Sequence, residues 1–270
     1  MPDIDQYIER LQVCNPLRDQ IVGPAIQALH LPEGSRGLDA GCGVGLQAVL
    51  LAEAVGPDGH VTGLDVRPEF LAQAERVAEE AGLAERISFR QGDVNKLPFD
   101  DDAFDWVWSA SCVGYPAAEP LPLLRELVRV ARPGGRVAIL VWSSQMLLPG
   151  YPLLEARLNA TGAGIAPFTR SMRPDSHWLR ALGWFRDAGL QELKAQTLLG
   201  DVHAPMSDDM REALIALLEM RWDGAQSEVT PEDWAEYQRL SQPESPDFIL
   251  DRPDYYAFFT ESLFHGKVAK

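Results

Sequence analysis

The stretch that decides the fold spans residues 35–65, and its centre reads Asp39-Ala-Gly41-Cys-Gly43-Val-Gly45. A short apolar segment precedes the three glycines, and the residues after them favour a helix. Glycines suit a turn between a strand and a helix, because they adopt unusual dihedrals and let a ligand approach the backbone closely. The stretch therefore predicts a strand, a glycine-rich turn and the N-terminus of a helix.

A second strand is predicted over residues 60–66 and contains Asp65 at its tip, 22 positions after Gly43. An acid at the end of the second strand of such a unit can accept hydrogen bonds from both hydroxyls of a ribose. The glycine turn and this acid together predict a pocket for a nucleoside.

The spacing of the glycines distinguishes between classes of nucleoside ligand. Dinucleotide-binding turns read G-x-G-x-x-G, whereas this turn reads G-x-G-x-G and has Asp39 just before it. A carboxylate at that position would repel a pyrophosphate but would suit a ligand that carries an ammonium group. No Lys-Ser or Lys-Thr follows the glycines, which excludes a phosphate-binding P-loop.

At these residues the chain resembles the class I S-adenosylmethionine-dependent methyltransferases, whose first motif has the form [D/E]-x-G-x-G-x-G. Two later segments fit the same family in the expected order: residues 97–107, with Leu-Pro-Phe and then Asp-Ala-Phe-Asp-Trp-Val, and residues 131–135, with Ala-Arg-Pro-Gly-Gly. The resemblance covers residues 35–145 well and is to the small-molecule, ubiquinone/menaquinone-biosynthesis-like type. It implies an α/β, Rossmann-like fold with a seven-stranded, mostly parallel sheet, helices on both faces and a helical cap.

The resemblance also implies a set of residues that bind S-adenosylmethionine and its product S-adenosylhomocysteine. Asp65 would bind the ribose, and Asp93 and Val94, after a third strand, would bind the adenine. The residues after the fourth strand, Ser109, Ala110, Ser111 and Tyr115, would face the reacting centre. The full expected set is Asp39, Gly41, Cys42, Gly43, Asp65, Val66, Arg67, Gly92, Asp93, Val94, Ser109 and Tyr115. Tyr7 and Arg18, in a leading helical segment, are either further cofactor contacts or part of a solvated helix face.

The organisation expected for residues 1–270 is a single domain. N-terminal helices occupy residues 1–34, the cofactor-binding core residues 35–145, and a substrate side residues 146–270. Within the last part, residues 201–254 form a predicted cap with 14 acidic residues against 4 Arg. The cap is expected to be either a lid over the cleft or a solvated elaboration. If it is a lid, its aromatic residues are candidates to border an apolar acceptor site; they are Trp222, Trp234 and Tyr237.

Composition limits the partners of the protein. A net charge of −16 and a pI of about 4.7 disfavour nucleic-acid substrates. Three widely separated cysteines argue against a disulfide framework and against a metal site, and favour a reducing cytoplasm. No apolar run approaches the length of a membrane span, and the first residues do not resemble an export signal. The oligomeric state is not predicted.

The function predicted from these features is methyl transfer from S-adenosylmethionine to a small-molecule acceptor by in-line displacement. Alignment of the acceptor with the methyl carbon accounts for much of the rate, and a base is needed only for an acceptor that must lose a proton. No catalytic base is assigned; the candidates by type and region are Tyr115, Tyr151, His177 and His203. The alternatives are an NAD(P)-dependent oxidoreductase and a non-catalytic S-adenosylmethionine-binding module.

Overall fold

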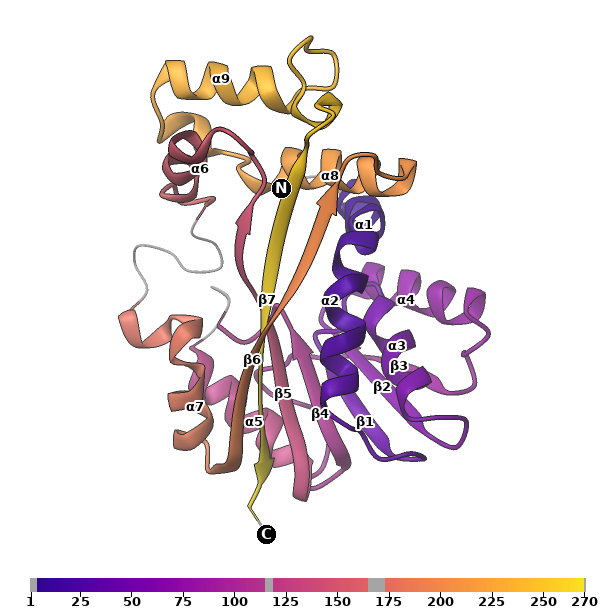
Figure 1. Cartoon of the computed structure of the whole chain (residues 1–270). Coiled ribbons are helices and arrows are strands. Elements are labelled where there is room, and N and C mark those ends of the chain that lie inside the picture. Colours follow the sequence, from indigo (N-terminus) through magenta and orange to yellow (C-terminus); the bar gives the residue numbers. More distant parts are fainter. Residues whose placement is uncertain (1–3, 115–118, 165–172, 270) are drawn as a thin grey trace.

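The computed structural model describes residues 4–114, 119–164 and 173–269 of the chain (Figure 1). Its centre is a seven-stranded sheet with the strand order β3-β2-β1-β4-β5-β7-β6. The strands are β1 (Arg36–Ala40), β2 (His60–Asp65), β3 (Ile87–Gln91), β4 (Phe104–Ala110), β5 (Ala131–Met146), β6 (Leu190–His203) and β7 (Tyr256–Val268).

Strands β1 to β5 run parallel, and β7 is antiparallel to both β5 and β6. The predicted fold class, a seven-stranded and mostly parallel sheet with helices on both faces, is confirmed. Because the chain reverses its strand order beside β1, the carboxyl ends of β1, β2 and β4 meet at one edge of the sheet. Ligands of open α/β sheets bind at such a point.

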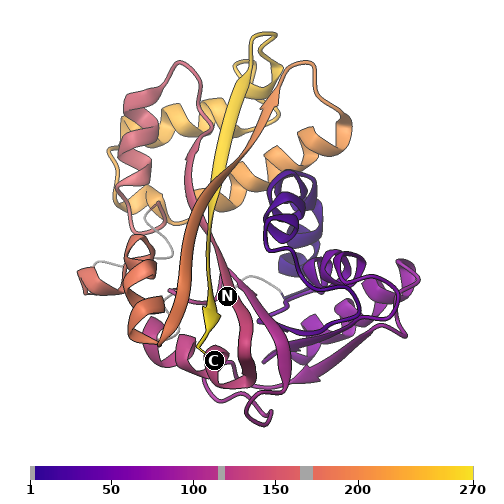
Figure 2. The ribbon, with the colours of Figure 1, turned by 60° about the horizontal axis from the view of Figure 1, so that its bottom comes forward.

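Helices cover both faces of the sheet (Figure 2). Apolar side chains of α2, α3 and α8 contribute to one buried cluster, and those of α5 and α7 contribute to another. The helices are α1 (Ile4–Val13), α2 (Asn15–Ala28), α3 (Leu46–Ala54), α4 (Pro68–Glu80), α5 (Pro120–Val130), α6 (Pro152–Asn159), α7 (Ala181–Asp187), α8 (Asp208–Arg221) and α9 (Pro231–Ser241). None of the helices in the described ranges is both long and apolar enough to cross a lipid bilayer.

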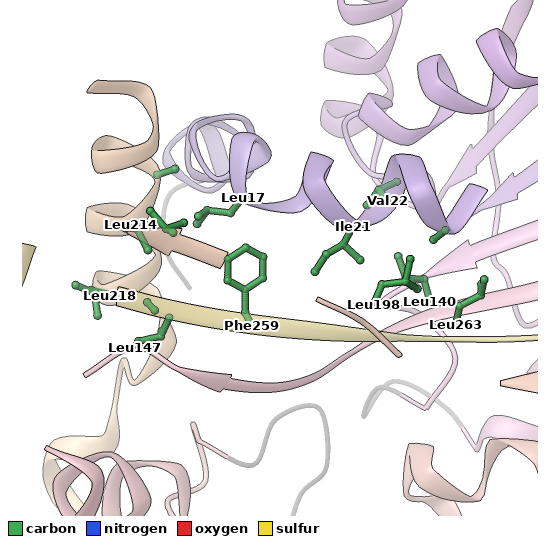
Figure 3. Close-up of a cluster of buried hydrophobic side chains, with 14 of the residues drawn as sticks. Leu17, Ile21, Val22, Leu140, Leu147, Leu198, Leu214, Leu218, Phe259 and Leu263 are labelled. Carbon is green, nitrogen blue, oxygen red and sulfur yellow. The ribbon is translucent and has the colours of Figure 1, made fainter. Parts of the chain in front are cut away.

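The cap is built on the main core. Figure 3 shows Leu214 and Leu218 of α8 beside Leu17 of α2 and Phe259 of β7, and all four side chains are almost completely buried. Removing α8 would therefore expose apolar surface of α2 and β7. Helix α8 of the predicted cap is thus part of the main core.

Three elements of the second half of the chain have irregular bounds. Strand β5 begins at Ala131, inside the Ala-Arg-Pro-Gly-Gly segment, and pairs with β4 across a bulge at Phe104/Trp106. Strand β6 continues to His203, because β7 pairs with it along its whole length. Two short 3₁₀ turns, Pro174–Ser176 and Trp178–Arg180, precede α7.

Candidate functional site

The glycine turn joins β1 to α3 and has the left-handed backbone that its sequence predicts. Gly41, Gly43 and Gly45 have φ values of +80°, +53° and +81°. A Cβ on Gly45 would lie 2.7 Å from the Cβ of Ala74, so this glycine allows α4 to approach the turn. A Cβ on Gly43 would meet nothing within 4 Å, so this glycine borders open space.

Asp65 connects this turn to the end of β2. Its Oδ2 accepts a hydrogen bond from the backbone N–H of Gly43 at 3.0 Å, and its Oδ1 accepts one from the N–H of Arg67 at 3.0 Å. The acid expected to bind a ribose therefore also holds the glycine turn in place. Each carboxylate oxygen has a second lone pair, which can accept a further hydrogen bond from a ligand.

Asp39 is the most unusual group in this region. Its side chain is 1% exposed, and its Oδ2 has no hydrogen-bond partner among the described residues. Burial, reinforced by the nearby carboxylate of Asp65 and opposed by Arg18, raises the pKa of Asp39 from 3.8 to about 7. Buried polar atoms normally have a partner, so this oxygen indicates a missing donor.

Asp39, Gly41, Cys42, Gly43 and Asp65 line one cavity of about 280 Å³, which we call the glycine-turn pocket. Helices α1 and α2 supply its opposite wall; the other residues that line it include Tyr7, Arg18, Phe70, Ser111 and Cys112. The structure thus brings five of the twelve sequence-predicted residues together in one cavity.

The wall formed by α1 and α2 is held by two contacts. Tyr7 stacks on Phe70 of α4 with a centroid distance of 6.0 Å. Arg18 forms a bidentate ion pair with Glu261 of β7, in which Nε and Nη2 donate to the two carboxylate oxygens at 3.0 and 3.3 Å. The Glu261 side chain is only 1% exposed. Sequence analysis left Tyr7 and Arg18 open between a cofactor contact and a solvated face, and both border the pocket.

The residues expected at the adenine end follow β2 and β3, next to Asp65 but outside the glycine-turn pocket. Gly92 donates its N–H to the Asp65 carbonyl at 3.0 Å, while the Val66 side chain is 61% exposed. Asp93 accepts hydrogen bonds from the backbone and side chain of Asn95 at 2.9 and 2.8 Å. Arg67 and Val94, the remaining members of this group, lie in the turns that follow the same two strands.

The expectation that the Ser109 side chain faces the reacting centre is wrong. Ser109 is 1% exposed, and its hydroxyl donates to the Ala40 carbonyl at 2.8 Å, so it joins β4 to β1. The next residues, Ala110, Ser111 and Cys112, border the glycine-turn pocket instead. Tyr115 lies outside the described residues.

A second cavity, of about 630 Å³, lies beyond the end of β4. Strand β4 ends at Ala110, opposite Leu140, whereas β5 continues to Met146 and leaves this edge unpaired by β4. We call this space the β5 cavity; it is lined by Trp142, Ser143, Ser144, Gln145, Asn159, Gly164, His177, Trp178, Leu179 and Arg221.

The two cavities are neighbours on the sheet. Ser111, which lines the glycine-turn pocket, donates its N–H to Leu140, two residues before Trp142 of the β5 cavity. Trp142 is also paired in register with Glu261, the partner of Arg18. The linings of the two cavities therefore include residues at neighbouring positions of the sheet.

The candidate bases lie in different places. His177 borders the β5 cavity, and burial lowers its pKa below 6.5, which favours the neutral imidazole. His203 is an exposed residue at the end of β6, and Tyr151 packs at the edge of the main core before α6. The cap aromatics do not line the β5 cavity: Trp222 and Tyr237 are buried inside the cap, with Trp234 beside Tyr237.

Sequence analysis missed most of the β5 cavity. Trp142, Gln145, Trp178 and Arg221 come from β5, a 3₁₀ turn and α8, and no local motif marks any of them. The one available signal is the apolar run at residues 137–141, which places Trp142 at the carboxyl end of a strand.

Residues 38–135, which include β1, the glycine turn and β4, match the family model described as a methyltransferase domain. This match, over a little more than a third of the chain, supports the sequence resemblance to the class I S-adenosylmethionine-dependent methyltransferases.

Two curated relatives match part of the chain. The chain is 44% identical over 107 residues to an arsenite methyltransferase of Halobacterium salinarum, covering 39% of this chain and 27% of the relative. It is 33% identical over 129 residues to a demethylmenaquinone methyltransferase of Listeria welshimeri, covering 47% and 52%. The matches thus span about a quarter and about half of the length of these two relatives.

A solved structure of an S-adenosylmethionine-dependent methyltransferase from Aquifex aeolicus superimposes with a TM-score of 0.52 at 23% identity, covering 70% of this chain and 90% of the other. This similarity supports the fold.

Proposed function

We propose that this protein transfers a methyl group from S-adenosylmethionine to a small-molecule acceptor. The observation that carries the proposal is the buried Oδ2 of Asp39. This oxygen has no hydrogen-bond donor among the described residues, and Asp39 lines a pocket formed by a methyltransferase-like glycine turn. The ammonium group of the methionine moiety is a donor of the required charge. A pyrophosphate in its place would be repelled, which disfavours a nicotinamide cofactor.

The described residues fit the ammonium group, the ribose and the adenine of the cofactor. Asp39 would accept from the ammonium group, and Asp65 would accept from the ribose hydroxyls with its second lone pairs. The open space at Gly43 would let the ligand lie against the backbone. Asp93 and Val94, after the neighbouring strand β3, would meet the adenine.

When bound, S-adenosylmethionine supplies a methyl carbon made electrophilic by the sulfonium. The contribution of the chain is to fix that group with Asp39 and Asp65 and to hold an acceptor beside it, since positioning supplies much of the rate of such a displacement. The β5 cavity is the space next to the glycine-turn pocket where an acceptor would lie. Among the described groups, the neutral His177 is the one candidate base that borders this cavity.

The acceptor does not follow from the relatives. Their names state arsenite and demethylmenaquinone, two chemically different acceptors, and the family model matches residues 38–135, which contain the predicted cofactor-binding residues up to Ser109 and Tyr115. The net charge of −16 supports a small molecule over a nucleic acid.

Label transfer from S-adenosylmethionine with a radioactive methyl group tests the proposal. Fractionated metabolite extracts and RNA are offered separately to the wild type and to Asp39→Asn. The proposal expects label in a small-molecule fraction with the wild type and much less with the variant. Binding of S-adenosylhomocysteine without transfer to any fraction would favour a non-catalytic binding module, and transfer to RNA alone would contradict the small-molecule acceptor.

A further inference from the structure

The two amide side chains that line the β5 cavity, Gln145 and Asn159, have oxygens that each already accept two hydrogen bonds. The Oε1 of Gln145 accepts from Trp142 Nε1 at 3.0 Å and from Arg221 Nε at 2.6 Å. The Oδ1 of Asn159 accepts from Gln145 Nε2 at 3.4 Å and from Trp222 Nε1 at 3.1 Å. Among the hydrogen bonds between described residues none uses the amide nitrogen of Asn159, so this donor is the polar atom of the side chain that a ligand can use.

The cavity also carries a positive charge. The guanidinium of Arg221 donates to three neutral oxygens, at Gln145 Oε1, Ala163 and Gly164, over 2.6 to 2.9 Å. None of the described residues that line the cavity is acidic, although the chain has 40 Asp and Glu. Glu155, which interacts with Arg221 through space, turns both oxygens toward the backbone N–H groups of Leu147 and Leu148.

The remaining walls of the cavity are largely flat and apolar. Trp142 is fixed by parallel stacking on Phe259, with a centroid distance of 5.5 Å and an interplanar angle of 7°. Trp178 and His177 contribute two further rings, with a centroid distance of 5.3 Å, and Leu179 adds an apolar side chain. Flat aromatic walls suit a planar ligand, because rings stack with an offset or meet edge to face.

We propose that the β5 cavity binds the methyl acceptor and that the acceptor is a planar aromatic molecule carrying an oxyanion. Arg221 and the amide nitrogen of Asn159 hold the oxyanion, and Trp142 and Trp178 contact the ring. That the ligand is the methyl acceptor rests on the proposed function. The preference of the cavity for an anionic ligand rests only on the contacts described above. Charge-assisted hydrogen bonds to a desolvated oxyanion are stronger than those to a neutral oxygen.

Calorimetry with three ligands that share one ring and differ in charge tests the preference: 2-naphthoate, 2-naphthamide and 2-naphthylmethylamine. Each is titrated into the full chain with and without saturating S-adenosylhomocysteine. The wild type is expected to bind 2-naphthoate at least about tenfold more tightly than the amide, a difference typical of one charge-assisted hydrogen bond. The amine is expected to bind most weakly.

Asn159→Asp is the most specific variant, because it keeps the oxygen that accepts from Gln145 and Trp222 and replaces the amide nitrogen by a second oxygen. It should remove the preference for the carboxylate. Arg221→Gln should do the same, although it also removes contacts to residues 163 and 164. Gln196→Glu, an exposed position on β6, adds the same negative charge elsewhere and should leave the preference unchanged.

Equal or tighter binding of the amide or the amine, binding of none of the three ligands, or an unchanged preference in folded Asn159→Asp would overturn the proposal. Failure of the proposed function is a separate outcome. In that case S-adenosylhomocysteine would not bind, whereas the titrations without it would still show the preference of the cavity for 2-naphthoate.

Discussion

Replacing Asp39 by Asn separates a ligand-binding role from a structural one. The change removes a buried charge and keeps the shape of the side chain. Because the Asp39 Oδ2 lacks a partner among the described residues, the free protein gains little from the charge, whereas the cofactor ammonium needs it. Loss of a charge-assisted hydrogen bond costs about 1.5–3 kcal/mol, or roughly 10- to 150-fold in the dissociation constant of S-adenosylhomocysteine.

The stability of the free protein should change in the opposite direction. The pKa of Asp39 is about 7 in the fold against 3.8 in an exposed state, so the folded chain binds more protons than the unfolded chain between these values. The contribution of Asp39 to the free energy of unfolding therefore falls as the pH rises from about 4 to about 7. At pH 8 the Asn variant, which carries no charge to bury, should melt at a higher temperature than the wild type.

Binding should show the matching pH dependence. The ammonium group requires ionised Asp39, so affinity of the wild type for S-adenosylhomocysteine should rise as pH increases toward 7 and level off above it. Below pH 7 the slope approaches about tenfold per pH unit at most. Calorimetric titrations at pH 5.5, 6.5 and 8 and thermal melts of both proteins measure these effects. A variant that loses stability at pH 8 but keeps its affinity and its pH profile would refute the reasoning.

Three further predictions concern the turn, the ribose acid and the cap. Gly43→Val should abolish cofactor binding. The control Gly82→Val, at a glycine that is also left-handed (φ +69°) and also bordered by open space, should strain the fold but keep cofactor binding. Equal cofactor affinities of the two variants would show that the glycine turn is only structural. Asp65→Ala should weaken binding by at least about 1.5–3 kcal/mol in calorimetry, because the ribose contacts and the Gly43 hydrogen bond are both lost, and unchanged affinity would exclude a ribose role. Leu218→Ala should lower the free energy of unfolding by about 2–5 kcal/mol in denaturant titrations, since α8 packs in the main core; a loss below 1 kcal/mol would mean that the cap is separable.

The part of the site that could be predicted is the part encoded locally. The glycines, Asp39 and Asp65 lie within 27 consecutive residues, and the backbone φ values that Gly41, Gly43 and Gly45 adopt follow from the residue type. Their common pocket then follows from the meeting of the carboxyl ends of β1 and β2. The seven-stranded, mostly parallel sheet was implied by the family resemblance, which rests on motifs that are equally local.

The rest depends on contacts between distant segments. Ser109 is turned toward Ala40 by its place in a strand between two others, which the sequence of one strand does not reveal. Arg221 reaches Gln145, 76 positions away, because α8 crosses the extended end of β5. The unusual pKa of Asp39 likewise needs the burial and the Asp65 neighbour that the fold creates.

One measurement tests the central claim most directly: a calorimetric titration of the purified wild type with S-adenosylhomocysteine and, in parallel, with NADH. A pocket built from Asp39, the glycine turn and Asp65 should bind one equivalent of S-adenosylhomocysteine, show no heat with NADH, and lose the first signal in Gly43→Val. Binding of NADH in place of S-adenosylhomocysteine would contradict the account.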